Sequence, residues 1–203
     1  MAKRPRNRRD RIIDAALGLA AEKPWRTVSL GEIAAAAKVG LADLHGEFPS
    51  RTAILGGVMA RADAAVLSDI DPSTLSEPPR DRLLDALLRR LDALAPHKAA
   101  IGAILRDTRC DPVGALCLAP RLLSSMGWTL EAAGIGSVGL SGRLRVKGLT
   151  AIWLGALAVW LRDDSKDQGK TMAFLDRRLR QAERLACLLP DARRPGKSGP
   201  VPT

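Results

Sequence analysis

The stretch from Val28 to Leu55, VSLGEIAAAAKVGLADLHGEFPSRTAIL, constrains the fold more than any other part of the chain. Ser29 is a favourable N-cap residue, and Glu32 follows three positions later. This spacing predicts a capping box, with a helix over residues 30–37. The segment 38–40, Lys-Val-Gly, reads as a tight turn.

A second short helix is expected directly after this turn, over residues 41–47, because Gly40 can begin it and Pro49 ends it. The residue before a proline is pushed out of the α region, so Phe48 leaves the helix. Ser50 can cap the next helix. Two short helices across a tight turn, with a basic arm upstream, predict a helix-turn-helix.

The same segment resembles the DNA-binding domain of the TetR family of bacterial regulators. The matching positions are Ser29, Ile33, Ala34, Ala37, Val39, Leu44, Phe48, Pro49, Ser50, Arg51 and Leu55. The resemblance implies an N-terminal three-helix domain whose recognition helix is 41–47. It also implies contacts with double-stranded DNA from Ser29, Leu41, Ala42, Asp43, His45 and Arg51.

The recognition helix departs from what direct base readout favours. Arg, Lys, Asn and Gln are the usual readers of base edges, and residues 41–47 contain none of them. Asp43 and Glu47 carry the same sign of charge as the phosphates. Asp43 has two other interpretations: a carboxylate that favours the helix dipole, or an acceptor for a cytosine amine.

Charge supports a polyanionic partner but does not concentrate in the helix-turn-helix. The net charge of the 203-residue chain is +10. It divides into +4 over residues 1–60, −1 over 61–140 and +7 over 141–203. The arm at residues 1–9 holds five basic residues, and Arg4 and Arg6 are candidates for phosphate or minor-groove contacts. A solvated tail remains an equal alternative.

Composition favours helices throughout. Aromatic residues make up 3% of the chain, tyrosine is absent and alanine and leucine fill the apolar positions. We therefore expect an all-α protein with a helix-turn-helix domain at 1–55, a connecting helix and linker at 56–78, a ligand-binding and dimerisation bundle at 79–189 and a disordered tail at 190–203.

The bundle resembles a second family, the TetR-fold lipid-binding accessory proteins of ubiquinone biosynthesis. This resemblance is clearest over residues 158–179, AVWLRDDSKDQGKTMAFLDRRL. It implies a lipid-like ligand in the C-terminal half, and a helix-turn-helix that need not bind DNA. Candidate residues for an apolar ligand site are Leu88, Met126, Trp128, Trp153, Leu157 and Trp160. Plain core packing is the commoner role for each of them.

The last helix carries apolar residues at alternating spacings of three and four. This heptad pattern is typical of one helix packing along another. We predict that the last two helices form a homodimer interface that includes this pattern, and packing within the chain is the alternative. The residues are Met172, Leu175, Leu179, Ala182 and Ala186.

Several functional classes find no support in the sequence. Gly134–Gly139 fits G-x-G-x-x-G, but a helix is expected before it and a dinucleotide site needs a strand, so we interpret it as an inter-helix loop. No catalytic motif or metal-ligand spacing is present, and no enzyme activity or cofactor is expected. The three cysteines form no C-x-x-C motif, and we expect no secretory leader. The longest apolar run is too short to span a bilayer. These features favour a cytoplasmic location.

The sequence therefore favours a TetR-type DNA-binding transcriptional regulator, whose C-terminal bundle binds a small apolar effector that controls operator binding. The alternative is a lipid-binding accessory protein of ubiquinone biosynthesis that has the same fold and little or no specific DNA binding.

Overall fold

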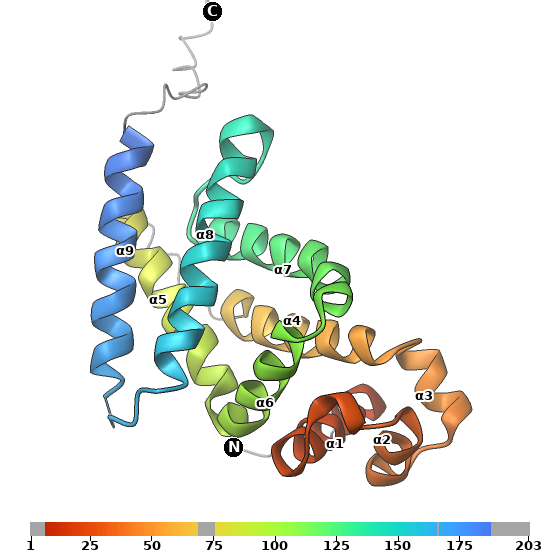
Figure 1. Ribbon diagram of the computed structural model, residues 1–203. Helices are drawn as coiled ribbons and strands as arrows, with labels where there is room; N and C mark the ends of the chain where they lie inside the picture. Colours follow the sequence, from red (N-terminus) through yellow and green to blue (C-terminus); the bar gives the residue numbers. More distant parts are fainter. Residues whose placement is uncertain (1–6, 69–75, 166, 188–203) are drawn as a thin grey trace, which may run out of the picture.

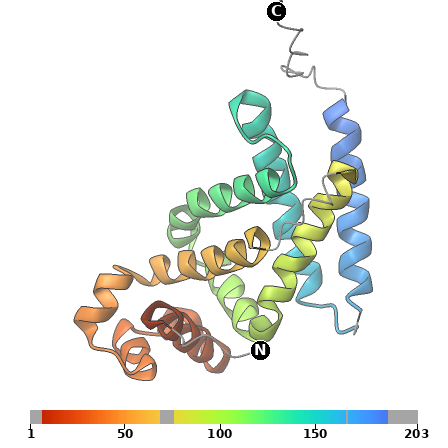
Figure 2. The same ribbon diagram turned by 180° about the vertical axis from the view of Figure 1, so that it is seen from behind.

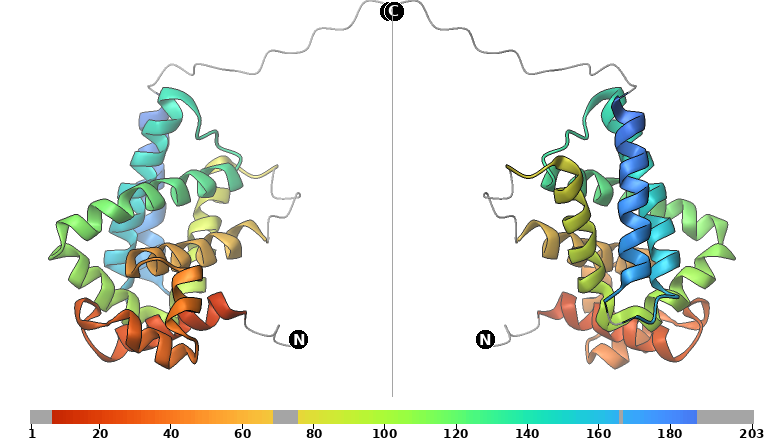
Figure 3. Two further views of the ribbon diagram at one scale, coloured as in Figure 1. Left: turned by 90° about the vertical axis from the view of Figure 1, so that its right-hand side faces the viewer. Right: turned by 90° about the vertical axis from the view of Figure 1, so that its left-hand side faces the viewer.

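The computed structural model describes residues 7–68, 76–165 and 167–187, and every regular element in this part of the chain is a helix (Figure 1). The all-α prediction is confirmed. The helices form a small N-terminal group at one end and a larger bundle above it, as the side views show (Figure 3).

The N-terminal group consists of α1 (Arg8–Glu22), the 3-10 helix η1 (Trp25–Thr27), α2 (Leu30–Ala37) and α3 (Leu41–Glu47). The bounds of α2 and α3 match the sequence predictions. Apolar residues at helical spacing on each helix meet in one core, which consists of Ile12, Ile13, Ala16, Leu17, Ala20, Val28, Ile33, Ala34, Ala37, Leu44 and Phe48.

Helix α4 (Arg51–Leu67) joins this group to the bundle. It starts at the end of α3 and runs beneath α7 (Pro112–Ala132), which is clearest from behind (Figure 2). Gly57 lets α4 approach the helix-turn-helix closely, because a Cβ there would lie 2.7 Å from Cε1 of Phe48. The position of the helix-turn-helix is therefore tied directly to the packing of α4.

The bundle is completed by α5 (Pro79–Leu94), η3 (Ala95–His97), α6 (Lys98–Arg109), α8 (Gly139–Trp160) and α9 (Gly169–Cys187). Helices α8 and α9 lie side by side and extend away from the helix-turn-helix (Figures 1 and 3). The helix-turn-helix group rests on α6 and α4. The backbone amide of Arg26 donates to Oδ2 of Asp107 at 2.9 Å, and Arg61 pairs with Asp14 at 2.6 Å.

The segment between α7 and α8 is a loop, as predicted from its glycines. Gly134 has a φ of +70°, a conformation that favours glycine. A helix precedes this loop, so the G-x-G-x-x-G match has no strand in front of it. The linker predicted to end at residue 78 lies partly outside the described residues, and α5 begins at Pro79.

Candidate nucleic-acid interface

The turn of the helix-turn-helix is made by Lys38, which ends α2 in the left-handed conformation at φ 55° and ψ 50°. Its backbone amide donates to the carbonyl oxygens of Ala34 and Ala35. Glycine adopts such a conformation without strain, whereas a residue with a Cβ adopts it less readily. The lysine keeps the turn and adds an exposed cation beside it.

Ser29 and Glu32 form the predicted capping box. The Glu32 amide donates to the Ser29 hydroxyl oxygen at 3.2 Å, and the Ser29 amide and hydroxyl both donate to Oε2 of Glu32. Lys23 donates to the other carboxylate oxygen. Ser29, predicted to contact DNA, is therefore already engaged in starting α2.

These contacts lower the pKa of Glu32 from its ordinary value of 4.5 to about 2, first through the Lys23 hydrogen bond and then through the Ser29 amide and hydroxyl. Because the pKa is depressed in the folded state, the carboxylate stabilises the fold above pH about 4.5, and this contribution is lost as the pH falls towards 2.

Thermal unfolding measured between pH 5 and 2 should therefore show a steeper loss of stability in the native protein than in Glu32→Gln, which keeps a capping side chain without the titrating charge. Equal slopes for the two proteins would show that Glu32 is not held by these contacts.

Arg51, predicted to contact a phosphate, points inward. Its Nη1 lies 2.9–3.0 Å from the carbonyl oxygens of Trp25, Arg26 and Val28, and its guanidinium lies 5.7 Å from the Trp25 ring centre. Arg51 thus joins the start of α4 to the loop before α2. Its guanidinium therefore donates to carbonyl oxygens within the domain.

Helix α3 presents its N-terminal residues to solvent. Leu41 is 60% exposed, Ala42, Asp43 and His45 are also exposed, and Leu44 anchors the helix in the core. In a helix-turn-helix, the first turn of this helix, here residues 41–43, reaches base edges, and His45 lies in the last turn. The structure therefore brings four of the predicted DNA contacts onto one surface. Arg4 and Arg6 lie outside the described residues.

The two acids of α3 are paired with the first turn of α1. Arg8 Nη1 lies 3.0 Å from Oδ1 of Asp43, and Arg9 Nη1 lies 3.9 Å from Oε2 of Glu47. The guanidinium of Arg9 also lies 4.4 Å from the Phe48 ring centre. Sequence analysis missed both arginines as partners of α3, because the pairing depends on how α1 crosses the helix-turn-helix.

Five of the six candidate ligand residues belong to the core of the bundle. Met126, Trp153, Leu157 and Trp160 are buried, and Leu88 packs against the same core partly buried. Trp128 does not join them, because its side chain is 57% exposed on the outside of α7.

A charged cluster that sequence analysis missed lies beside these residues. Arg90 on α5 is only 2% exposed, and it pairs with Asp63 on α4. Ser125 on α7 accepts from Arg90 at 2.6 Å and donates to Asp63 at 2.6 Å. The guanidinium lies 5.1 Å from the ring centre of Trp153 on α8. The spacing of Leu83, Leu87, Arg90 and Leu94 on one face of α5 was the signal for a buried arginine.

A polar pocket of about 320 Å³ lies at the turn between α8 and α9. Its lining includes Trp160, Lys98 and Gln168, and Lys98 Nζ donates to the Asp163 carbonyl at 2.7 Å. Hydroxyl groups of Ser165 and Thr171 hold the pKa of the Asp163 carboxyl below its ordinary value. The charged and polar side chains of Lys98, Asp164 and Gln168 line this pocket beside the Trp160 ring, so it does not suit a purely apolar ligand.

The heptad pattern of α9 packs largely into its own chain. Leu175 and Leu179 are fully buried, Ala182 is partly buried and Met172 is exposed. The Ala186 side chain lies outside the described residues. Phe174 lies against α8, where a Cβ on Gly155 would come within 2.8 Å of its ring.

The outer face of α8 carries exposed apolar residues, with Lys147 exposed among them, and it is uncovered in the single chain. Leu144 is 52% exposed, Leu154 is 46% exposed and Ala151 between them is exposed. A Cβ on Gly148 would meet only open space among the described residues. This face is a surface on which another helix pair can pack.

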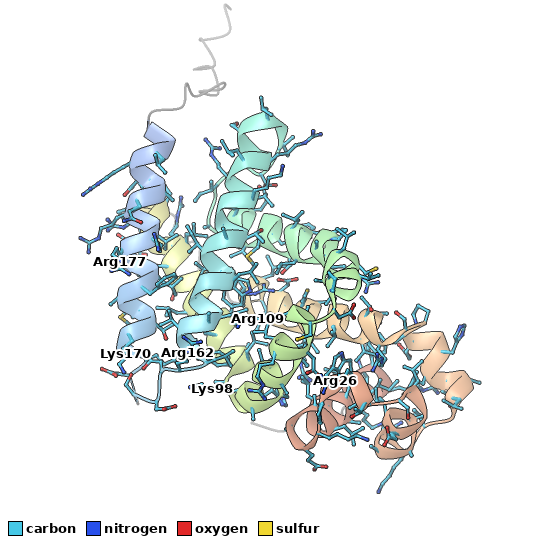
Figure 4. The ribbon with its side chains drawn as sticks, in the orientation of Figure 1. Arg26, Lys98, Arg109, Arg162, Lys170 and Arg177 are labelled. Carbon is cyan, nitrogen blue, oxygen red and sulfur yellow. The ribbon has the colours of Figure 1, made fainter. Side chains whose placement is uncertain are left out.

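Basic side chains also lie on the face of the molecule seen in Figure 4. Arg177 and Lys170 on α9, Arg162 after α8, Lys98 and Arg109 on α6, and Arg26 in η1 are spread from one side to the other. They are separated by acids such as Asp164. These six labelled basic side chains are thus dispersed over several helices, and none of them lies on α3.

Within the part of the chain that the structure describes, no group of three or more His, Cys, Asp or Glu side chains is arranged to hold a metal ion. No helix among the described residues is long and apolar enough to cross a membrane.

Two family models match the chain. Residues 12–58 match the bacterial regulatory proteins of the tetR family, and residues 145–186 match the COQ9 family. The first match spans α1 to the first half of α4, and the second spans most of α8 and α9. No curated protein sequence matches the chain.

Solved structures of TetR regulators share the fold along nearly the whole chain. A TetR transcriptional regulator from Nitrosomonas europaea is 27% identical, with a TM-score of 0.70 over 88% of this chain and 99% of that one. A TetR regulator from Rhodococcus sp. RHA1 is 22% identical, with a TM-score of 0.65 over 92% and 97% of the two chains.

A third structure, a putative TetR-family regulator from Syntrophomonas wolfei, is 19% identical, with a TM-score of 0.59 over 92% and 98%. The order of the helices, the helix-turn-helix geometry and these matches agree. The chain thus has the fold of the TetR-family transcriptional regulators, and its residues 12–58 form their helix-turn-helix domain.

Proposed function

We propose that the protein is a homodimeric TetR-type transcriptional regulator that binds double-stranded DNA through α3. The observation that carries this proposal is the exposed N-terminal end of α3 on a fully formed helix-turn-helix. The paired acids of α3 support it, because Arg8 and Arg9 offset charges that would otherwise repel phosphates.

The dimer interface of this proposal is the outer face of α8 with the adjoining side of α9. Leu144, Gly148, Ala151 and Leu154 supply the apolar and small residues, and Met172 extends them. Leu175, Leu179 and Ala182 hold α9 in place behind this surface. Two-fold symmetry would then present two copies of α3 to a roughly palindromic site.

Effector control would act through α4, because this helix enters both the helix-turn-helix and the bundle core. Asp63 on α4 is bound to Arg90 and Ser125, which lie beside the candidate ligand residues Met126 and Trp153. A ligand that spreads this core would change the packing of α4 and therefore the separation of the two DNA-binding heads.

A lipid-binding accessory function is the second candidate. The match of α8 and α9 to the COQ9 family favours it, as does the lack of Arg, Lys, Asn and Gln in α3. In that case, the buried core of Met126, Trp153, Leu157 and Trp160 would open around an isoprenoid-type lipid.

Native mass spectrometry of the purified protein, followed by identification of extracted molecules, separates the two. The regulator is expected as a dimer without a stoichiometric lipid. A dimer that carries one isoprenoid or quinone-like lipid per subunit, and that selects no DNA sequence, would replace the regulator with the accessory protein.

A further inference from the structure

The exposed end of α3 carries an unusual combination of groups for reading DNA. Leu41 offers a branched apolar side chain, Ala42 a methyl group and Asp43 a carboxylate, and all three are exposed at the first turn of the helix. None of these can donate a hydrogen bond to guanine O6 or N7, and none can form the paired contact that Asn or Gln makes with adenine.

The major-groove edges of the pyrimidines fit these groups instead. Thymine presents a C5-methyl group that takes an apolar contact, and cytosine presents an N4 amine that donates to a carboxylate. From this match we infer that α3 reads pyrimidines, with Leu41 packing on a thymine methyl group and Asp43 accepting from a cytosine amine. The inference rests on the proposed function, because it assigns bases to the same DNA-binding surface.

The salt bridge to Arg8 makes Asp43 suitable for this role. Arg8 Nη1 engages Oδ1 at 3.0 Å and supplies a positive charge beside the carboxylate. Oδ2 lies towards Gly40, where a Cβ would be 3.7 Å away, and among the described residues no hydrogen bond reaches it. One carboxylate oxygen is thus held by the protein and the other is available to a base.

The pairing also reduces the repulsion expected when a carboxylate approaches the phosphates. Each side chain of the pair is 49% exposed, so Arg8 lies at the same surface as Asp43. When this surface meets DNA, both side chains would lie in the protein–DNA interface. Arg8 is therefore a positioning residue, and Leu41 and Asp43 determine specificity. Glu47, at the opposite end of α3 and paired with Arg9, lies too far along the helix for the same bases.

The test begins with selection of duplexes from a random pool by the wild-type protein. Each thymine of the selected site is then replaced by uracil, which removes only the methyl group. At one position per half-site, we expect this to weaken binding about threefold to fivefold, as the loss of one buried methyl group implies. In Leu41→Ala, the same replacement should cost nothing.

Asp43→Asn is expected to move the preference at one position from cytosine to adenine, because an amide can pair with adenine N6 and N7. The change in relative affinity should be about tenfold or more, as a lost base contact implies. Asp164→Asn, which removes a carboxylate in the exposed turn after α8, is the matched control and should select the wild-type sequence.

The results of the selection distinguish a failure of the base assignment from a failure of the proposed function. If the wild-type protein enriches no sequence, the proposed function fails and the inference fails with it. If it enriches a site that Leu41→Ala and Asp43→Asn also select, with unchanged sensitivity to uracil, the protein is a sequence-specific DNA-binding protein and the assignment of bases to α3 is wrong.

Discussion

Asp63→Ala is expected to lower the free energy of unfolding by about 3–5 kcal/mol, the largest effect of any single substitution considered, because it leaves the buried Arg90 cation without its partner. For a chain of this size, that corresponds to a fall in Tm of roughly 10 °C. Chemical and thermal unfolding followed by circular dichroism measure both quantities.

Asp85→Ala on α5 is the matched control. Asp85 pairs with Arg89 at 2.9 Å, but its side chain is 54% exposed, so its removal should cost less than about 1 kcal/mol. The double variant Asp63→Leu with Arg90→Met should recover much of the loss, because it removes both charges together. Equal effects of Asp63→Ala and Asp85→Ala would show that the pair does not hold α4 in the bundle.

Ala151→Asp is expected to dissociate the proposed dimer, because it places a carboxylate between the exposed side chains of Leu144 and Leu154 in both subunits. An unpaired charge buried at the centre of an interface weakens association by about 100-fold or more. Because each monomer then binds a half-site alone, affinity for a palindromic duplex should fall by roughly 10²–10⁴.

Analytical ultracentrifugation measures the dimer and fluorescence anisotropy measures the DNA affinity. Ala60→Asp is the control, since Ala60 is an exposed alanine within α4, away from the outer face of α8. A dimer that survives Ala151→Asp unchanged would place the subunit interface on another surface.

Local sequence rules predicted the helix-turn-helix well, because its boundaries are set by nearby residues. Ser29 and Glu32 cap α2, and Pro49 ends α3, so the bounds of both helices follow from spacing and turn chemistry alone.

The roles of individual charged residues did not follow from the sequence, because they depend on contacts between distant segments. Arg51 looked available for a phosphate, but it reaches three carbonyl groups more than twenty residues earlier. Asp43 looked unfavourable for DNA until α1 brought Arg8 against it. Both outcomes depend on how the helices cross.

In the bundle too, the sequence pattern predicted a helix but not the surface that this helix contacts. The heptad spacing of α9 correctly indicated a helix that packs along others, but spacing cannot say whose surface it meets. Leu175 and Leu179 are covered by the same chain, whereas Leu144 and Leu154 on α8 are left exposed. A pattern of apolar residues therefore identified the helix, and only the fold identified the face available to a partner.

One ratio tests most directly whether α3 reads DNA sequence. It compares the affinities for a selected duplex and for a scrambled duplex of the same length and composition, measured at physiological salt. A TetR-type regulator should prefer the selected duplex by about 10³ or more, and its affinity should fall steeply as salt rises. A ratio near one, in a well-folded dimer, would contradict the proposal that α3 reads DNA sequence.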